Sequence, residues 1–336
     1  MSSSYPEAIR EGTAAAARLH LRLKTRRLLP DGIDSVDVVS AALDLGVSIL
    51  FRPLKGLLGA FLPLPAPGIL ITTERPLRIQ RFTAAHEVGH YFMKHQPSLD
   101  DEGILRRGMF TALPLGSDFQ EVEANAFAAS FLMPTWLVAH HCKRHGWIGP
   151  KLRPENIYQL ALRLGASYEA TCWTLGRYRM ISTDDARAFA AIAPRTFKTA
   201  LLGDVRPTDY RGDVWLLTDN DHRTLIAGSP NDLFVMQLNE HSGSGYLWDY
   251  SQLESSGFAI LRNGHLLLDQ AGVGSPGVRE IISQAGEAPF TACRLVERRP
   301  WLPHQPLQTL DLRFDLRGAE QPGFSRAERR RLLEAA

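Results

Sequence analysis

RFTAAHEVGHYFMKH, residues 81–95, contains the pattern His-Glu-x-x-His inside a segment of helical character. Residues four apart project from the same face of a helix, so His86 and His90 can direct their imidazole nitrogens at one point. Zn²⁺ accepts such nitrogens at about 2.0–2.1 Å in tetrahedral geometry. Glu87 then stands beside the metal, where it can take a proton from the attacking water. Because the short pattern also occurs by chance, the rest of the chain has to decide its meaning.

A second helical segment, FQEVEANAFAASFLMP at 119–134, offers the third ligand that a catalytic zinc site needs. Glu121 and Asn125 share a helix face. In one class of zinc peptidases the third ligand is a Glu, and an Asp or Asn four residues later hydrogen-bonds a ligand histidine. Glu123 points about 200° away from Glu121 and is expected to be a surface carboxylate. It is the second choice for the third metal ligand, after Glu121. The alternative is a pair of core histidines and a salt-bridged glutamate.

The flanking elements follow from local signals. Residues 6–28 are helical and end in a basic run, for which a solvated helix face is the simpler interpretation. DSVDVVSAALDLGVSILF at 34–51 predicts a capped helix, a stop at Gly46 and a strand. LLGAFLPLPAPGILITT at 57–73 predicts a hairpin of two apolar strands that leads into the helix of the opening motif.

The character of the sequence changes near residue 205. Between 211 and 316, short β-type runs alternate with Gly, Pro and Asn turns, a spacing that indicates an all-β sandwich or barrel. The stretch 183–210 is expected to be a linker with room for one connecting helix. Residues 318–336 are expected to form a tail that ends in a short exposed helix. The whole chain is therefore predicted to be α+β.

The composition is that of a soluble globular protein, with 44% hydrophobic and 22% charged residues. The net charge of +2 gives no global field that would favour nucleic acid as a partner. Three widely spaced cysteines argue against a disulfide framework and fit a reducing cytoplasm. No apolar run approaches the roughly 20 residues of a membrane span, and the N-terminus does not read as a signal peptide. We therefore expect a cytoplasmic protein that makes no use of a membrane.

RFTAAHEVGHYFMKH and EVEANAFAASFLMP together resemble the ImmA/IrrE family of metallopeptidases, over about residues 30–180. The resemblance implies a peptidase domain at 1–182. Within it, a gluzincin-like mixed α/β core is implied at about 30–135. A helical segment with helix-turn-helix rhythm is implied at 153–181.

The same resemblance implies a site and a substrate. Zn²⁺ would be held by His86, His90 and Glu121, with Glu87 as the catalytic base. Asn125 would orient a ligand histidine from behind. The substrate would be a regulatory protein, typically a helix-turn-helix repressor that is cut to release transcription.

Three stretches of the β part resemble the loops of chagasin-like inhibitors of cysteine peptidases: NEHSGSGYLW at 239–248, GSPGVRE at 274–280 and ERRPW at 297–301. The resemblance implies an immunoglobulin-like β-sandwich at 211–317. The first loop departs from the inhibitor pattern, so inhibition of cysteine peptidases is not expected. Tyr246, Trp248 and Trp301 are the candidate partner-binding side chains. The two tryptophans can equally belong to the sandwich core.

The leading hypothesis is a cytoplasmic zinc endopeptidase whose β domain binds a partner or regulates the peptidase. The alternative is a non-proteolytic zinc sensor that acts through its β domain. Direct nucleic-acid binding by 153–181 is not expected, because its second helix carries only Arg177 and Arg179, late in the segment. Strand 68–74 is a candidate edge for binding an extended substrate, although its apolar residues can equally belong to the buried core. Loop 96–118 is a candidate lid. The sequence does not identify an oxyanion donor; the possible ones are Tyr91, His140, His141 and Tyr158.

Overall fold

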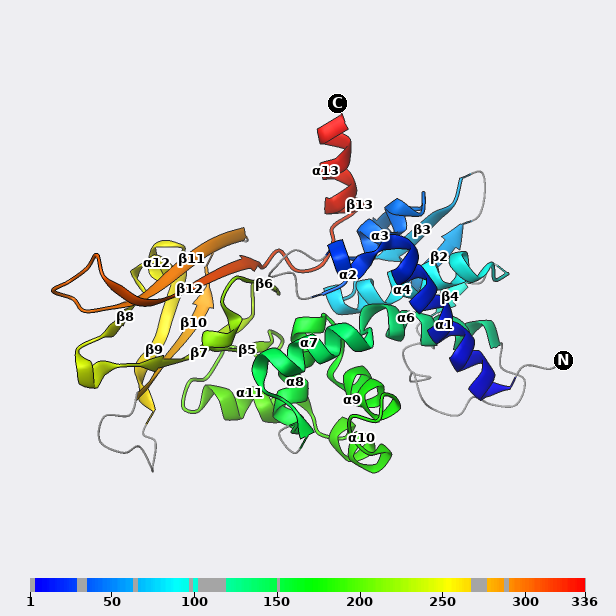
Figure 1. Cartoon of the computed structure of the whole chain (residues 1–336). Coiled ribbons are helices and arrows are strands. Elements are labelled where there is room, and N and C mark those ends of the chain that lie inside the picture. Colours follow the sequence, from blue (N-terminus) through cyan, green and yellow to red (C-terminus); the bar gives the residue numbers. More distant parts are fainter. Residues whose placement is uncertain are drawn as a thin grey trace.

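The computed structural model describes residues 4–28, 35–62, 66–96, 99–101, 119–149, 152–266, 277–286 and 290–335. Helices and one sheet make up one end of the molecule, and two further sheets make up the other (Figure 1). The chain passes from the helical end to the β end near residue 205 and returns to the helical end after residue 315. The prediction of an α+β fold is confirmed.

The first sheet has the strand order β13-β1-β3-β2-β4. Its strands are β1 (Ser48–Arg52), β2 (Leu57–Leu62), β3 (Gly68–Thr72), β4 (Leu99–Asp101) and β13 (Gly323–Phe324). The predicted hairpin is β2–β3, with Leu62 opposite Gly68. β3 was expected to offer an edge to the substrate, and that prediction is wrong, because β3 pairs on one side with β1 and on the other with β2. The two ends of the sheet are β13 and β4.

The helices confirm most of the predicted boundaries. They are α1 (Tyr5–Leu23), α2 (Thr25–Leu28), α3 (Val38–Asp44), α4 (Leu77–Met93), α6 (Phe119–Leu132), α7 (Thr135–His145), α8 (Pro154–Leu164), α9 (Tyr168–Arg177), α10 (Thr183–Ala190) and α11 (Pro194–Leu202). Gly46 and Gly165 have φ of 79° and 64°, which favours glycine at these two breaks. The linker 183–210 contains two helices, α10 and α11, where one was expected.

Small residues allow α1, α4 and α6 to approach closely. A Cβ on Gly12 of α1 would lie 2.1 Å from the backbone oxygen of Glu123 in α6, so only glycine fits there. A Cβ on Gly89 of α4 would lie 3.0 Å from the ring of Phe127 in α6, so the absence of a side chain at residue 89 lets the two helices pack closely. The position of α6 relative to α4 is therefore determined by backbone approach as well as by side-chain packing.

The β end contains two four-stranded sheets, ordered β5-β7-β10-β9 and β6-β12-β11-β8. Side chains of both sheets share one hydrophobic core, in which the rings of Phe234 and Phe314 lie 5.1 Å apart in a T-shaped arrangement. The elements are β5 (Val214–Leu217), β6 (Thr224–Ala227), β7 (Leu233–Glu240), β8 (Leu247–Asp249), α12 (Ser251–Ser255), β9 (Phe258–Leu266), β10 (Gly277–Ala285), β11 (Phe290–Arg298) and β12 (Pro306–Asp315), with short 3₁₀ turns η2 (Asp219–Asp221) and η3 (Ser242–Ser244).

Helix α8 covers the free edge of β5. The amide of Gln159 donates to the oxygen of Val214 at 2.9 Å and accepts from the nitrogen of Leu216 at 2.8 Å, as a neighbouring strand would. One turn later, Arg163 donates to the oxygen of Leu216 and forms a 2.7 Å ion pair with Asp221. These bonds attach the helical part to the β part. They also bury Gln159 and Arg163 of α8.

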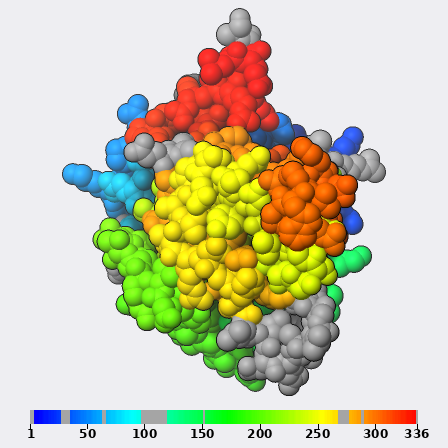
Figure 2. Space-filling model, turned by 90° about the vertical axis from the view of Figure 1, so that its left-hand side faces the viewer, coloured from blue at the N-terminus to red at the C-terminus, as the bar shows by residue number. Residues whose placement is uncertain are grey.

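The C-terminal segment returns to the first sheet. Phe324 in β13 pairs with Leu50 in β1, and the side chain of Gln80 in α4 accepts a 2.7 Å hydrogen bond from the nitrogen of Glu320. Helix α13 (Arg326–Ala335) follows and projects from the molecule, as Figure 2 shows in red above the β end. Among the described residues no helix is long and apolar enough to cross a membrane.

Candidate metal centre

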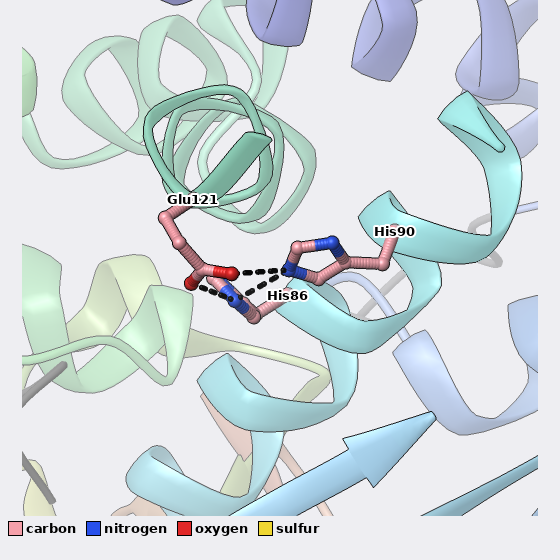
Figure 3. Close-up of side chains that lie close together, drawn as sticks. All are labelled: His86, His90 and Glu121. Carbon is pink, nitrogen blue, oxygen red and sulfur yellow. Dashed lines mark hydrogen bonds and ion pairs between the residues drawn. The ribbon is translucent and has the colours of Figure 1, made fainter. Parts of the chain in front are cut away.

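His86, His90 and Glu121 lie together at the contact between α4 and α6 (Figure 3). The Nε2 atoms of the two histidines are 2.9 Å apart. Glu121 Oε2 lies 3.3 Å from His86 Nε2, and Glu121 Oε1 lies 3.5 Å from His90 Nε2. One turn of α4 aligns the two rings, as the i, i+4 spacing requires, and α6 supplies the carboxylate opposite them.

These separations fit a tetrahedral metal ion. Two nitrogen or oxygen ligands at about 2.0–2.1 Å from tetrahedral zinc lie about 3.3 Å from each other. The three separations in the structure, 2.9, 3.3 and 3.5 Å, scatter around that value. Two imidazoles and one carboxylate are also a ligand set that zinc uses in peptidases, with the fourth position left to water or substrate. That these residues bind a metal stays a prediction.

The outer side of each imidazole has a partner. His86 Nδ1 lies 3.0 Å from Asn125 Oδ1, the contact that the spacing of Glu121 and Asn125 predicts. His90 Nδ1 lies 3.0 Å from His95 Nδ1, and His95 Nε2 lies 2.9 Å from Glu123 Oε2. Glu123 was expected to be a surface carboxylate, but its side chain is only 17% exposed and binds His95.

Glu87 is buried beside this group, with 1% of its surface exposed. A Cβ on Gly59 of β2 would lie 2.9 Å from Glu87 Oε1 and 2.5 Å from Thr83 Cγ2. The carboxylate of Glu87 thus fits against the backbone of β2 only because residue 59 lacks a side chain. The role of Gly59 could not be predicted from the sequence, because a glycine inside an apolar strand run carries no local signal of what approaches it.

The possible oxyanion donors do not gather in one place: Tyr158 and Tyr91 lie in different parts of the molecule. Tyr158 belongs to the junction with the β part, where it donates to Asp213 Oδ1 at 3.1 Å and accepts from the nitrogen of Val214. Burial and the nearby Asp213 raise the pKa of Tyr158 well above its usual value, so it stays protonated. Tyr91 follows His90 in α4 and packs against Phe61. Most of the candidate lid, residues 97–98 and 102–118, lies outside the described residues.

The candidate partner-binding side chains of the β part separate into two kinds. Trp248 is 5% exposed and belongs to the sandwich core, and its indole nitrogen donates to the oxygen of Asn239. Trp301 is 66% exposed and covers Gly245. The guanidinium of Arg299 lies 4.5 Å from the centre of the Tyr246 ring. Of the Gly-rich stretch 274–280, residues 277–280 begin β10 and the first three lie outside the described residues.

Helices α4 and α6, which carry His-Glu-x-x-His and the facing Glu121, lie within a segment that is similar to a known family. Residues 42–175 match the model of the IrrE N-terminal-like domain, Peptidase_M78. The match includes α4 and α6 and ends within α9. This segment is thus similar to a peptidase-type domain, and the match covers less than half of the chain. A comparison with curated proteins finds no match.

Solved structures resemble a smaller part of the chain. A cysteine protease inhibitor of Entamoeba histolytica, EhICP2, shares 24% identity at a TM-score of 0.29; the match covers 32% of this chain and 100% of that one. Amebosin shares 22% identity at a TM-score of 0.27, over 31% of this chain and 98% of that one.

Proposed function

We propose that the protein is a zinc-dependent endopeptidase that cuts a regulatory protein, in particular a helix-turn-helix transcriptional repressor. The observation that supports it best is the convergence of His86, His90 and Glu121, whose ligand atoms all lie within 4.8 Å of one another beside the buried Glu87. The repressor as substrate rests on the resemblance to the ImmA/IrrE family. The buried free cysteines fit a cytoplasmic location.

Each residue has a distinct part in this proposal. Zinc, when bound, would act as a Lewis acid toward the scissile carbonyl and lower the pKa of water. His86, His90 and Glu121 would hold it, and Asn125 would fix the ring of His86. Glu87 accepts the proton of the attacking water and delivers it to the leaving amine. The burial of Glu87 keeps its carboxylate in one place.

The first test is metal content. We expect the purified protein to contain about one zinc ion per chain and the His86→Ala variant to contain less than about a tenth of that, because two remaining ligands do not close a zinc site. Atomic absorption measures both. His140→Ala, a change of the same kind at an exposed histidine of α7, is the control and should keep its zinc. A wild-type protein that cannot be loaded with zinc would end the proposal.

The second test concerns the substrate. Co-expression with a helix-turn-helix repressor encoded nearby should shorten the repressor when the peptidase is wild type and leave it intact with His86→Ala. The alternative function, a zinc sensor without proteolysis, predicts zinc in the wild-type protein and an intact repressor in both. The two functions therefore differ in whether the shortened repressor appears beside the wild-type protein, which mass spectrometry detects.

We further propose that residues 211–317 form a chagasin-like sandwich that binds a partner protein. The turns that carry Tyr246 and Trp301 lie at the end of the molecule away from α4 and α6 (Figure 1). In this arrangement they do not cover the candidate metal centre, which favours binding of a separate protein over direct blocking of the peptidase. An exposed tryptophan beside a glycine turn suits such a contact.

We expect Trp301→Ala to reduce cleavage of the natural substrate by about 10–100-fold if that substrate is the partner, since exposed aromatic anchors often contribute 2 kcal/mol or more. Zinc content should not change. Leu307→Ala, at an exposed leucine of β12, is the control. Faster cleavage by Trp301→Ala would show restraint in place of docking, and an unchanged rate would exclude this surface from substrate binding.

A further inference from the structure

The two candidate ligand histidines have different partners on their outer sides. His86 meets an amide, Asn125, whereas His90 meets a second histidine, which in turn meets a carboxylate. The contacts His90 Nδ1 to His95 Nδ1, 3.0 Å, and His95 Nε2 to Glu123 Oε2, 2.9 Å, form a continuous hydrogen-bonded row. We call His90, His95 and Glu123 the outer row.

We propose that His95 and Glu123 are positioning residues that hold the ring of His90 in the orientation required for metal binding. This inference rests on the zinc site proposed above. A histidine that binds metal through Nε2 carries its hydrogen on Nδ1, so His90 donates to Nδ1 of His95. The hydrogen of His95 then lies on Nε2 and is donated to Glu123. Every nitrogen in the outer row has one role, and no two hydrogens face each other.

The end of α4 brings His95 into this position. Lys94 has φ of 60°, in the left-handed region that non-glycine residues rarely adopt. The reversal lets the nitrogen of Lys94 bond the oxygen of Tyr91 at 3.2 Å and the nitrogen of His95 bond the oxygen of His90 at 3.0 Å. This is a Schellman turn, and it folds residue 95 back onto residue 90. A lysine in this conformation is strained, so the turn has to be held by the contacts around it.

Burial makes the row effective. The side chains of His90 and His95 are 3% and 6% exposed, and that of Glu123 is 17% exposed. In such surroundings water replaces a lost partner poorly, and hydrogen bonds to a carboxylate are strong. Glu123 and Glu121 stand two residues apart on α6. The same helix therefore supplies a direct ligand and the anchor of the outer row.

A purely structural clamp between the two helices is the competing explanation. A second contact already joins the same segments, because the nitrogen of Gln96 donates to Gln120 Oε1 at 2.7 Å. This bond involves neither the side chain of His95 nor that of Glu123, so we expect it to remain when either is replaced. The two explanations differ in what they affect: a clamp changes the stability of the metal-free protein, and a positioning row changes zinc affinity.

The experiment measures the zinc dissociation constant of the full chain by competition with a chromogenic chelator. We expect His95→Ala and Glu123→Ala each to weaken zinc binding by about 10–100-fold, as removal of such outer partners does. The double variant should bind zinc about as tightly as the single variant with the lower zinc affinity, because the two residues act in series and the loss of either one already breaks the row. Glu123→Gln keeps an oxygen that accepts from His95 and should recover most of the affinity.

His241→Ala is the matched control. His241 also pairs with a buried glutamate, Glu297, at 3.1 Å, but in the β part, and its loss should leave zinc affinity unchanged. The inference would be overturned if both alanine variants bound zinc with wild-type affinity. It would also be overturned if the double variant lost as much zinc-binding free energy as the two single variants together. A lower melting temperature of the metal-free variants with no change in affinity would overturn it as well. A wild-type chain that binds no zinc would instead contradict the proposed function.

Discussion

Replacing Glu87 by Gln is expected to lower peptide cleavage by at least about 10²–10⁴-fold while zinc binding stays at the wild-type level. Glutamine has nearly the same shape as glutamate, so it fits the space against Gly59 that the absent Cβ leaves. It cannot accept the proton of the attacking water. The three proposed ligands are untouched, so the metal site keeps its donors.

The measurement combines zinc content with the rate of repressor cleavage by the purified proteins. Glu74→Gln, the same change at an exposed glutamate shortly before α4, should cut at the wild-type rate. A Glu87→Gln protein that cleaves a genuine substrate at the native rate would rule out this residue as the base. A variant that loses its zinc would assign Glu87 to metal binding or to folding instead.

Replacing Asp221 by Ala is expected to lower the free energy of unfolding by about 3–5 kcal/mol, because it leaves a buried charge without its partner. The side chains of Arg163 and Asp221 are 3% and 2% exposed, and their closest atoms are 2.7 Å apart. Asp221 also accepts from the nitrogen of Thr218 at 2.9 Å, which holds the turn after β5. The pair joins α8 to the β part, so its loss should weaken both.

Calorimetry of the full chain checks this prediction through the melting temperature. Asp311→Ala is the control: its partner Arg294 is 59% exposed, and exposed pairs contribute about 0–1 kcal/mol. Arg163→Met combined with Asp221→Ala should recover part of the loss, since the double variant has no unpaired buried charge. Equal effects of Asp221→Ala and Asp311→Ala would show that the junction contributes little to stability.

Local patterns were enough for the elements that carry the proposed chemistry. The four-residue spacings of His86 with His90, and of Glu121 with Asn125, predict which side chains share a helix face. The helix positions agree with that expectation. The hairpin β2–β3 and the runs that became β7 and β11 were also predictable, because apolar stretches between turn residues have short-range causes. Such patterns depend on neighbours within a few residues along the chain.

The contacts that the sequence did not reveal join residues far apart in the chain. Glu123 was assigned to the surface because helix geometry places it away from Glu121, yet the Schellman turn at Lys94 brings His95 to it. β3 was assigned to an edge because nothing local shows that β1 pairs along its other side. The placement of Trp248 in the core likewise required both sheets of the β part.

By itself, the sequence determined the helices that carry His86, His90 and Glu121, the pairing of β2 with β3 and the set of side chains available to a metal. Only the tertiary structure decided how α8 satisfies the open edge of β5, how β13 closes the first sheet and which groups stand behind His90. The reason is physical: periodicity and capping are settled within one or two turns of chain, whereas hydrogen bonds between distant segments depend on which surfaces meet after packing.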